Sequence, residues 1–377
     1  MSKRGFAGLG LAALAAITLV ATAAIAGQTQ PAGAKPAAAQ KPVGASGGGR
    51  AAAANKFVPK RTPWGDPDIS GNFTTKDEAN TPFERPDEFA GKRIEDITPQ
   101  QLEALNEKRR REALADAPYP GGGSRVRGVA IAVPIHWFDS LDSQNSRPWF
   151  VVDPPDGKIP PVTDAAKQRT ANLAAYRRGR GTADSYTDRS PGDRCIAFAV
   201  GAGRVAPTLY GNSVQILQTK DYVAIRYEMI HETRIIPIEG RGASRPHVTG
   251  QLSSYWGDAV ARWEGDTLVV DTTNFSGKSN FRGSSDGLHT IERFTRVAPT
   301  KIDFRATIDD AKTWTRPWTF AIMWTEDDSQ PIFEYACHEG NYGLRNILSA
   351  GRSDDRKGVT SSDSVDAQQD LKDEFEQ

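Results

Sequence analysis

The chain has 377 residues, with 47 basic and 47 acidic side chains and hence a formal net charge of zero. Neither end supplies the basic, aromatic-studded face that nucleic-acid binding needs, so we predict no nucleic-acid partner. Residues 62–352 lie between two ends of biased composition, and this length suits one large domain, alone or with an N-terminal elaboration.

The N-terminus has the pattern of a secretory signal peptide. Lys3 and Arg4 precede an apolar run over residues 6–25, followed directly by Ala26 in a small-x-small sequence. We expect residues 1–26 to be removed by cleavage after Ala26, which makes the mature chain periplasmic or secreted. The run is also long enough for an uncleaved anchor, since a spanning helix needs roughly 20 apolar residues. Such an anchor is the only membrane contact that we predict.

Both ends of the mature chain are predicted to be disordered. Residues 27–61 are mostly Ala, Gly, Pro and Lys and cannot bury enough apolar surface to offset their chain entropy. This linker is solvated or, as the alternative, rests its positive charge on an anionic membrane surface. Residues 353–377 are polar and acid-rich, without an aromatic side chain before Phe375, and form the second disordered tail.

Residues 62–192 are irregular and rich in Pro and Gly, which predicts an elaboration of helices and loops. Thr98 has the pattern of a helix N-cap, because Pro99 follows it at the first helical position. Thr163 caps a second predicted helix. A short strand is expected over residues 148–152, where aromatic and β-branched residues precede a turn.

Residues 193–352 change to a pattern of strand, turn and strand. Without helical spacers, the strands predict an antiparallel meander that closes into a barrel or folds into two packed sheets, since an open sheet leaves its edges exposed. We therefore predict a mainly β protein, an antiparallel lipocalin-like β-barrel or a closely related meander, with a short closing helix over 341–348. The predicted strands lie near 213–219, 222–228, 231–238, 254–263, 267–273, 288–297, 301–308, 314–325 and 332–337.

Cys195 and Cys337 are the two cysteines of a chain that we expect in an oxidising compartment. A disulfide between them would close a loop of more than a hundred residues and join the start of the strand region to its last strand. Two buried free thiols are the alternative, because a sequence does not show proximity. We favour the disulfide.

The densest cluster of chemical groups lies at residues 333–343, which hold two carboxylates, a His, a Cys and two Tyr. General acid–base catalysis needs two groups whose environments separate their pKa values, and the cluster supplies such pairs. It matches no catalytic motif, so it predicts a site without naming a reaction. The catalytic candidates are Glu334, His338, Glu339, His231 and Glu292.

Charged and aromatic side chains in the middle of predicted strands are candidates for ligand binding. In a barrel wide enough to hold a ligand, the polar face of a strand can be the lumen. Arg side chains clamp anionic groups, and aromatic rings stack on ligands, although the aromatic alternation over 314–324 is more typical of a core than of a ligand platform. The substrate-binding candidates are Arg234, Asp258, Arg293, Arg316, Trp318, Tyr335 and Tyr342.

No metal or cofactor is predicted. A zinc site built from His231, His289 and His338 has no supporting spacing, because the chain contains neither His-x-His nor His-Glu-x-x-His. The glycine-rich segments 121–124 and 201–203 lack the strand-to-helix context of a dinucleotide or phosphate loop.

Five motifs resemble those of a large, mostly uncharacterised family of exported soil-bacterial proteins. The resemblance covers most of residues 62–352 and implies export, but it carries over no activity and no catalytic residue. The meander that begins at the Trp-Glu-Gly-Asp-Thr hairpin also looks like lipocalin-type barrels, by analogy of fold alone. The motifs lie at 62–71, 151–161, 262–275, 291–294 and 335–344.

We therefore expect an exported, cofactor-independent enzyme, a lyase, hydrolase or isomerase that acts by acid–base chemistry. Its expected substrate is a small glycoside, a sugar acid or a plant-derived aromatic. The alternatives are a periplasmic small-molecule-binding protein without turnover and an envelope interaction module.

Overall fold

The computed structural model describes residues 57–115, 124–126, 129–131, 143–178, 180–181, 183–198, 205–208, 210–248, 252–278, 281–329 and 331–358. All of them belong to one compact unit. The predicted signal peptide, most of the predicted linker and the tail beyond Gly358 lie outside the described residues. Among the described helices, none is long and apolar enough to cross a membrane.

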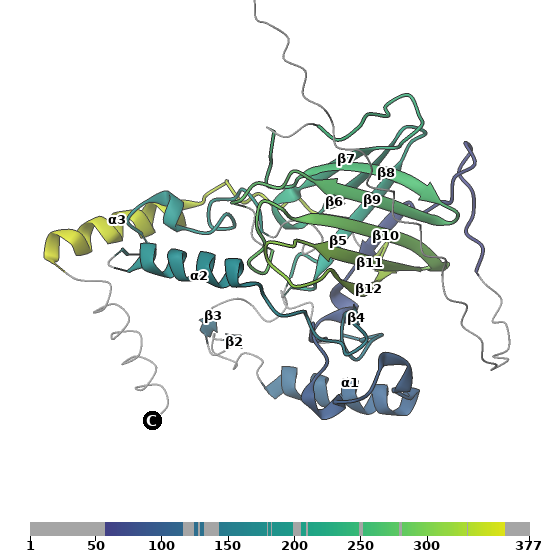
Figure 1. The fold of residues 1–377 in the computed structure, drawn as a ribbon, viewed down its shortest axis with the longest axis horizontal. Coiled ribbons are helices and arrows are strands. Elements are labelled where there is room, and N and C mark those ends of the chain that lie inside the picture. The colour runs from purple at the N-terminus through teal and green to yellow at the C-terminus, as the bar shows by residue number, and fades with distance from the viewer. Residues whose placement is uncertain are drawn as a thin grey trace, which may run out of the picture. The chain divides into compact units, whose positions relative to one another are not determined.

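The centre of the fold is a ten-stranded antiparallel sheet that is nearly closed into a barrel (Figure 1). Its strand order is β7-β6-β5-β1-β12-β11-β10-β9-β8, and β4 also pairs with β12. A parallel bridge between Ile238 and Ala261 joins the two ends of this order. The prediction of a mainly β, antiparallel, barrel-like fold is confirmed, whereas the specific likeness to lipocalins stays a prediction. The strands are β1 (Gly71–Thr74), β4 (Val151–Asp153), β5 (Ser213–Gln218), β6 (Tyr222–Tyr227), β7 (Thr233–Pro237), β8 (Asp258–Glu264), β9 (Thr267–Thr273), β10 (His289–Ala298), β11 (Lys301–Asp309) and β12 (Trp318–Glu326).

Two strands of the sheet come from the segment that we expected to be an elaboration of helices and loops. β1 lies between β5 and β12, where Phe73 is buried and its ring lies 6.4 Å from that of Trp324. β4 pairs with β12 through Val151. The boundary at residue 193 therefore does not separate the sheet from what precedes it. The short strand expected over 148–152 is present as β4, displaced towards the C-terminus, whereas the four residues of β1 are too few to show a clear alternation in the sequence.

The helices are α1 (Pro99–Ala115), α2 (Asp164–Arg177) and α3 (Tyr342–Lys357), and short β2 (Ser124–Val126) and β3 (Val129–Ile131) form a separate ladder. The two predicted N-caps are present, since the hydroxyls of Thr98 and Thr163 each accept a hydrogen bond from a backbone N–H three residues on, both at 3.2 Å. α3 is longer than expected and ends at Gly358, which has the left-handed backbone of a helix C-cap. The predicted disorder from residue 353 is thus wrong for residues 353–357.

Inside the barrel, alternate residues of each strand form the hydrophobic core. The ring centroids of Phe294 and Phe304 lie 5.1 Å apart, and Phe304 stacks on Trp324 at 5.3 Å. These side chains are fully buried. The strand directions place the end of β6, at Tyr227, on the same rim of the barrel as the start of β10 and the start of β12. We call this the Tyr227 end of the barrel.

Candidate functional site

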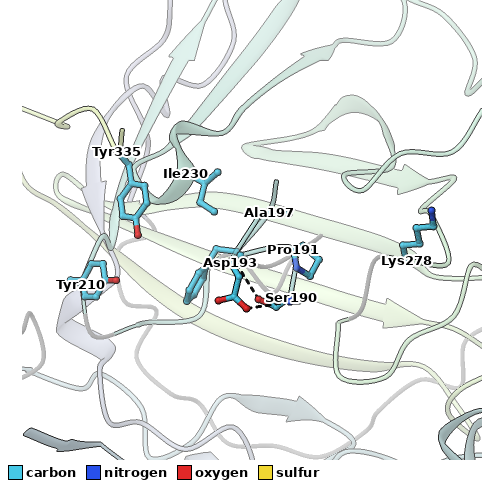
Figure 2. A pocket seen from close by; sticks show the side chains of 10 residues that line it. Ser190, Pro191, Asp193, Ala197, Tyr210, Ile230, Lys278 and Tyr335 are labelled. Carbon is cyan, nitrogen blue, oxygen red and sulfur yellow. Dashed lines mark hydrogen bonds between the residues drawn. The ribbon is translucent and has the colours of Figure 1, made fainter. Parts of the chain in front are cut away.

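Two adjoining cavities, at the Tyr227 end of the barrel, form the candidate site. The first, of about 340 Å³, is lined by residues of the segment 190–198 together with Tyr210, Ile230, Lys278 and Tyr335 (Figure 2). The second, of about 530 Å³, is lined by residues 334–337 and the start of α3. The two cavities share Gly192, Asp193, Tyr210 and Tyr335.

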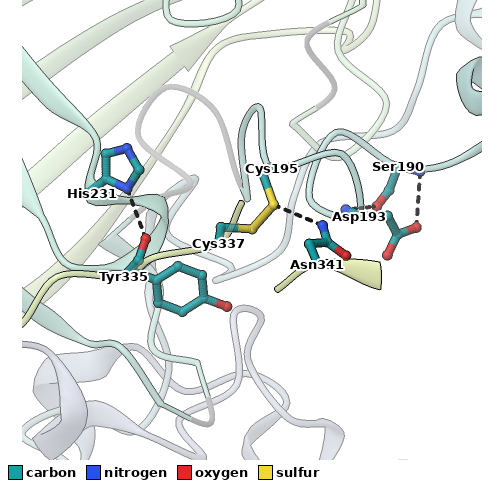
Figure 3. Close-up of a disulfide and its surroundings, with 7 residues drawn as sticks. All are labelled: Ser190, Asp193, Cys195, His231, Tyr335, Cys337 and Asn341. Carbon is teal, nitrogen blue, oxygen red and sulfur yellow. Dashed lines mark hydrogen bonds between the residues drawn. A yellow bond between two sulfur atoms is a disulfide. The ribbon is translucent and has the colours of Figure 1, made fainter. Parts of the chain in front are cut away.

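A disulfide between Cys195 and Cys337 holds the two walls of the site together (Figure 3). The two Cα atoms lie 5.6 Å apart although 142 positions separate them in the sequence. The side-chain amide of Asn341, at the N-terminus of α3, donates a hydrogen bond to Cys195 Sγ at 3.3 Å. The predicted pairing of the cysteines is confirmed, and it brings the segment 190–198 next to the predicted cluster at 333–343.

The carboxylate of Asp193 is held by a turn. Its Oδ2 accepts the backbone N–H of Ser190 at 3.3 Å, and its own N–H donates to Ser190 Oγ at 3.1 Å. The Arg189 guanidinium lies 3.1 Å from the same carboxylate. Asp193 is therefore a fixed acceptor on the wall that both cavities share.

Ile230 lines the first cavity, and it and its neighbour His231 have an unusual backbone conformation. Both have positive φ angles, 58° and 44°. A β-branched residue in this region is a clear outlier, and such strain gathers at ligand and active sites because the surrounding structure has to impose it. The His231 ring is tied to the predicted cluster, since its Nδ1 lies 2.9 Å from the backbone oxygen of Tyr335.

Tyr335 and Tyr210 place two phenol groups at the junction of the cavities. Burial, followed by the hydrogen bond with the Tyr210 side chain, raises the pKa of Tyr335 to about 12. The Tyr335 phenol is thus protonated at neutral pH and serves as a hydrogen-bond donor rather than as a base.

This pKa predicts how stability depends on alkaline pH. A folded-state pKa above the ordinary value of 10 means that the folded protein keeps a proton which the unfolded chain loses. The stabilisation is complete below pH 10 and is lost as the pH rises through about 12. Tyr335→Phe should therefore flatten the decline of the free energy of unfolding between pH 10 and 12, as measured by urea titrations at several pH values. Tyr342→Phe, which removes an exposed phenol, is the control; an unchanged slope in Tyr335→Phe would contradict the assignment.

The predicted cluster at 333–343 is only partly in the site. Glu334 lines the second cavity and Tyr335 lines both. His338 and Glu339 are exposed and line neither of them, and Tyr342 is 67% exposed. The cluster therefore contributes a carboxylate and a phenol to the cavities.

Arg234 and Glu292 lie inside the barrel and form a buried ion pair. The guanidinium contacts both carboxylate oxygens, at 3.0 and 2.7 Å, and Thr272 Oγ1 at 3.1 Å. Burial opposes the charge of Arg234, but the attraction of Glu292 outweighs it and raises the pKa of Arg234 above its usual value. The structure therefore places the catalytic candidate Glu292 and the binding candidate Arg234 in the core, where they pair with each other.

The remaining binding candidates lie apart from one another. Arg293 pairs with Glu264 at 2.8 Å, and Arg316 pairs with Asp153 at 3.1 Å, each in a partly exposed pair. β12 begins at Trp318 and not near residue 314 as predicted, so Arg316 precedes the strand.

The last two binding candidates also lie away from the lining of the two cavities. Trp318 is fully buried and stacks on Phe281 at 6.1 Å. Asp258 belongs to a cluster with Arg245 and His247.

Sequence reasoning missed Asp193, Tyr210 and Lys278, which line the first cavity. Asp193 could have been predicted from its position two residues before Cys195, because a disulfide brings the residues next to one cysteine close to those next to the other. Tyr210 and Lys278 had no comparable signal. Among the described residues, no group of three His, Cys, Asp or Glu side chains is arranged to hold a metal ion. Comparison with protein-family models, curated proteins and solved structures finds no match to this chain, so its function has to be inferred from the site itself.

Proposed function

We propose that the chain is an exported small-molecule-binding protein whose ligand occupies the two adjoining cavities. The observation that carries this proposal is their geometry. Their volumes, about 340 and 530 Å³, lie within the usual range for ligand sites, and a few polar groups converge on a shared wall. The disulfide fits an oxidising compartment and so supports export.

The chemistry of the lining indicates a hydroxylated ligand. The carboxylates of Asp193 and Glu334 accept hydrogen bonds from hydroxyl groups, and the Tyr335 phenol oxygen, whose proton is shared with Tyr210, accepts a further one. Lys278 offers a positive charge to an acidic group in the first cavity. A small glycoside, a sugar acid or a hydroxylated plant aromatic combines these features.

Acid–base turnover in the same cavities is the second candidate function. It is favoured by the two carboxylates, Asp193 and Glu334, that line the second cavity together with the Tyr335 phenol. A carboxylate can act as a base while a second group donates a proton. His338 and Glu339 have no part in this version of the proposal.

Binding and turnover are tested together with pooled glycosides, sugar acids and hydroxylated aromatics. Thermal shift and ligand mass spectrometry should find a stabilising ligand, and a new product mass would establish the enzyme. Glu334→Gln and Tyr335→Phe should each weaken binding about three- to tenfold, since one hydrogen bond is worth about 1 kcal/mol.

The matched controls are His338→Ala and Tyr342→Phe, which change exposed neighbours outside the lining of both cavities. They should leave the affinity unchanged. Equal losses in the controls and in the two test variants would contradict a ligand site in these cavities.

A further inference from the structure

Five charged and imidazole side chains form a continuous series of contacts across the strands β8, β9 and β10. The Arg245 guanidinium binds both oxygens of Asp258, at 2.5 and 3.1 Å. Asp258 Oδ2 also lies 3.1 Å from Nδ1 of His247. Nε2 of His247 lies 3.1 Å from Oδ1 of Asp271, and Nε2 of His289 lies 3.0 Å from the same oxygen.

The strand register places these side chains on the outer face of the sheet. Asp271 pairs with Val260 on one side and with Ile291 on the other, so these three side chains share a face. The next residue on β9, Thr272, is fully buried and contacts the Arg234–Glu292 pair inside the barrel. The five side chains therefore lie on the opposite side of the sheet from that pair, and none of them lines either cavity.

His289 is the last side chain of this series of contacts, and only one of its two ring nitrogens, Nε2, has a partner among them. An ionised carboxylate only accepts hydrogen bonds, so the nitrogen that faces Asp271, Nε2, carries the proton. The neutral ring then has its lone pair on Nδ1, for which no described residue supplies a partner. The side chain is 32% exposed, so this nitrogen is within reach of solvent. Asp309 is the residue opposite His289 on β11.

His247 differs from His289 because both of its ring nitrogens face carboxylates. It therefore has no nitrogen left to exchange a proton with a ligand. Asp258 holds the His247 ring in contact with Asp271. Asp258 is itself fixed by the Arg245 guanidinium and by the backbone N–H of Val248, which donates to it at 2.8 Å. These residues position Asp271, which in turn orients His289.

We propose that Asp271 and His289 form a general-base dyad, separate from the two cavities, that accepts a proton from water or from the hydroxyl group of a small molecule. The lone pair of Nδ1 takes the hydrogen, the O–H bond breaks, and its electron pair stays on the oxygen. Asp271 stabilises the imidazolium through the Nε2–H bond. A base oriented by a carboxylate is the arrangement that activates hydroxyl groups in hydrolytic enzymes. The dyad does not depend on the proposed ligand of the cavities.

The test is acylation of the full chain by diethyl pyrocarbonate, with the modification of each of its five histidines followed by mass spectrometry. The lone pair on the imidazole nitrogen attacks the carbonyl carbon and ethyl carbonate leaves. The acylated ring then loses the proton of its other nitrogen, and ethyl carbonate takes up a proton as it breaks down to carbon dioxide and ethanol. His289 should react, whereas His247 should react at least about tenfold more slowly, because both of its nitrogens are engaged. Equal rates at the two residues would overturn the proposal.

Asp271→Asn separates an oriented base from a merely exposed histidine. It should lower the rate at His289 about three- to tenfold relative to His338, since the carboxylate no longer stabilises the developing positive charge. Asp286→Asn, an exposed carboxylate paired with Lys312, is the matched control and should change nothing. An unchanged His289 rate in Asp271→Asn would refute the dyad.

A measurement without any substitution covers the case in which Asp271→Asn does not fold. Nitrogen-15 NMR of histidine-labelled protein should show His289 as the Nε2–H tautomer with an unprotonated Nδ1. The opposite tautomer would exclude Nδ1 as the base.

Discussion

Replacing both cysteines, Cys195→Ser with Cys337→Ser, should lower the free energy of unfolding by about 5 kcal/mol. In the chain-entropy model, the cost follows from the loop that the disulfide closes, and 142 positions separate these two residues. Typical domains have only about 5–15 kcal/mol in total, so the variant should be close to unfolding. Urea unfolding of the oxidised protein and of the variant measures the difference.

The same substitution should act locally on α3. No residue of α3 is fully buried, so packing alone holds this helix weakly. Its other contacts include Arg352, which donates to the backbone oxygens of Ala183 and Asp184 at 3.1 and 2.9 Å. Hydrogen exchange of the α3 amides should therefore accelerate far more than exchange in β10 and β11.

Reduction of the wild-type disulfide is the control for the serine hydroxyls, and it should reproduce both effects. A loss below about 1 kcal/mol would mean that the unfolded chain already keeps the two segments together, contrary to the entropic account. Uniform acceleration of exchange would show that the bond stabilises the fold globally without holding α3 in particular.

Local patterns in the sequence were enough for most of the fold. Thr98 and Thr163 were identifiable as N-caps because capping depends on residues three positions apart. β5, β6, β10 and β11 follow the alternation of polar and apolar residues closely, because one face of each strand is buried and the other is not. β1 was missed because its place in the sheet depends on pairing with β5 and β12, which are remote in the chain.

The site was predictable only in part, for a physical reason. The clustering of chemical groups along the sequence was enough to locate Glu334 and Tyr335. His338 belongs to the same cluster but is exposed, because its exposure depends on how the segment packs, which the sequence does not show. Asp193 reaches the site through the disulfide. The contact between Asp271 and His289 follows from the pairing of β9 with β10. Neighbours across a sheet are set by register, and register was not predicted.

Glu292→Gln should destabilise the protein by about 3–5 kcal/mol. Both partners of the pair lie in the core, with Glu292 fully buried and Arg234 7% exposed. The substitution keeps the shape of the side chain but leaves the guanidinium charge without compensation in a medium of low dielectric constant. Thr272 and the weak 3.5 Å contact with the Tyr227 hydroxyl do not replace a negative charge. Urea unfolding at pH 7 measures the loss.

An exposed ion pair between β10 and the end of β8 supplies the matched control. Arg293 pairs with Glu264 on the outer face, one residue beyond Glu292, so Glu264→Gln removes a carboxylate from a similar ion pair in water. Its effect should be much smaller, because solvent screens exposed charges.

The double variant Arg234→Met with Glu292→Leu decides what the buried pair contributes. If the cost of Glu292→Gln comes from an uncompensated charge, removing both charges should recover most of the lost stability, since an apolar pair of similar volume fills the same space without desolvation. If the double variant is as unstable as Glu292→Gln, the pair instead sets the geometry of β7, β9 and β10 through its hydrogen bonds. A polar pair at the Tyr227 end of the barrel would then hold in place the strands that lead into the candidate site.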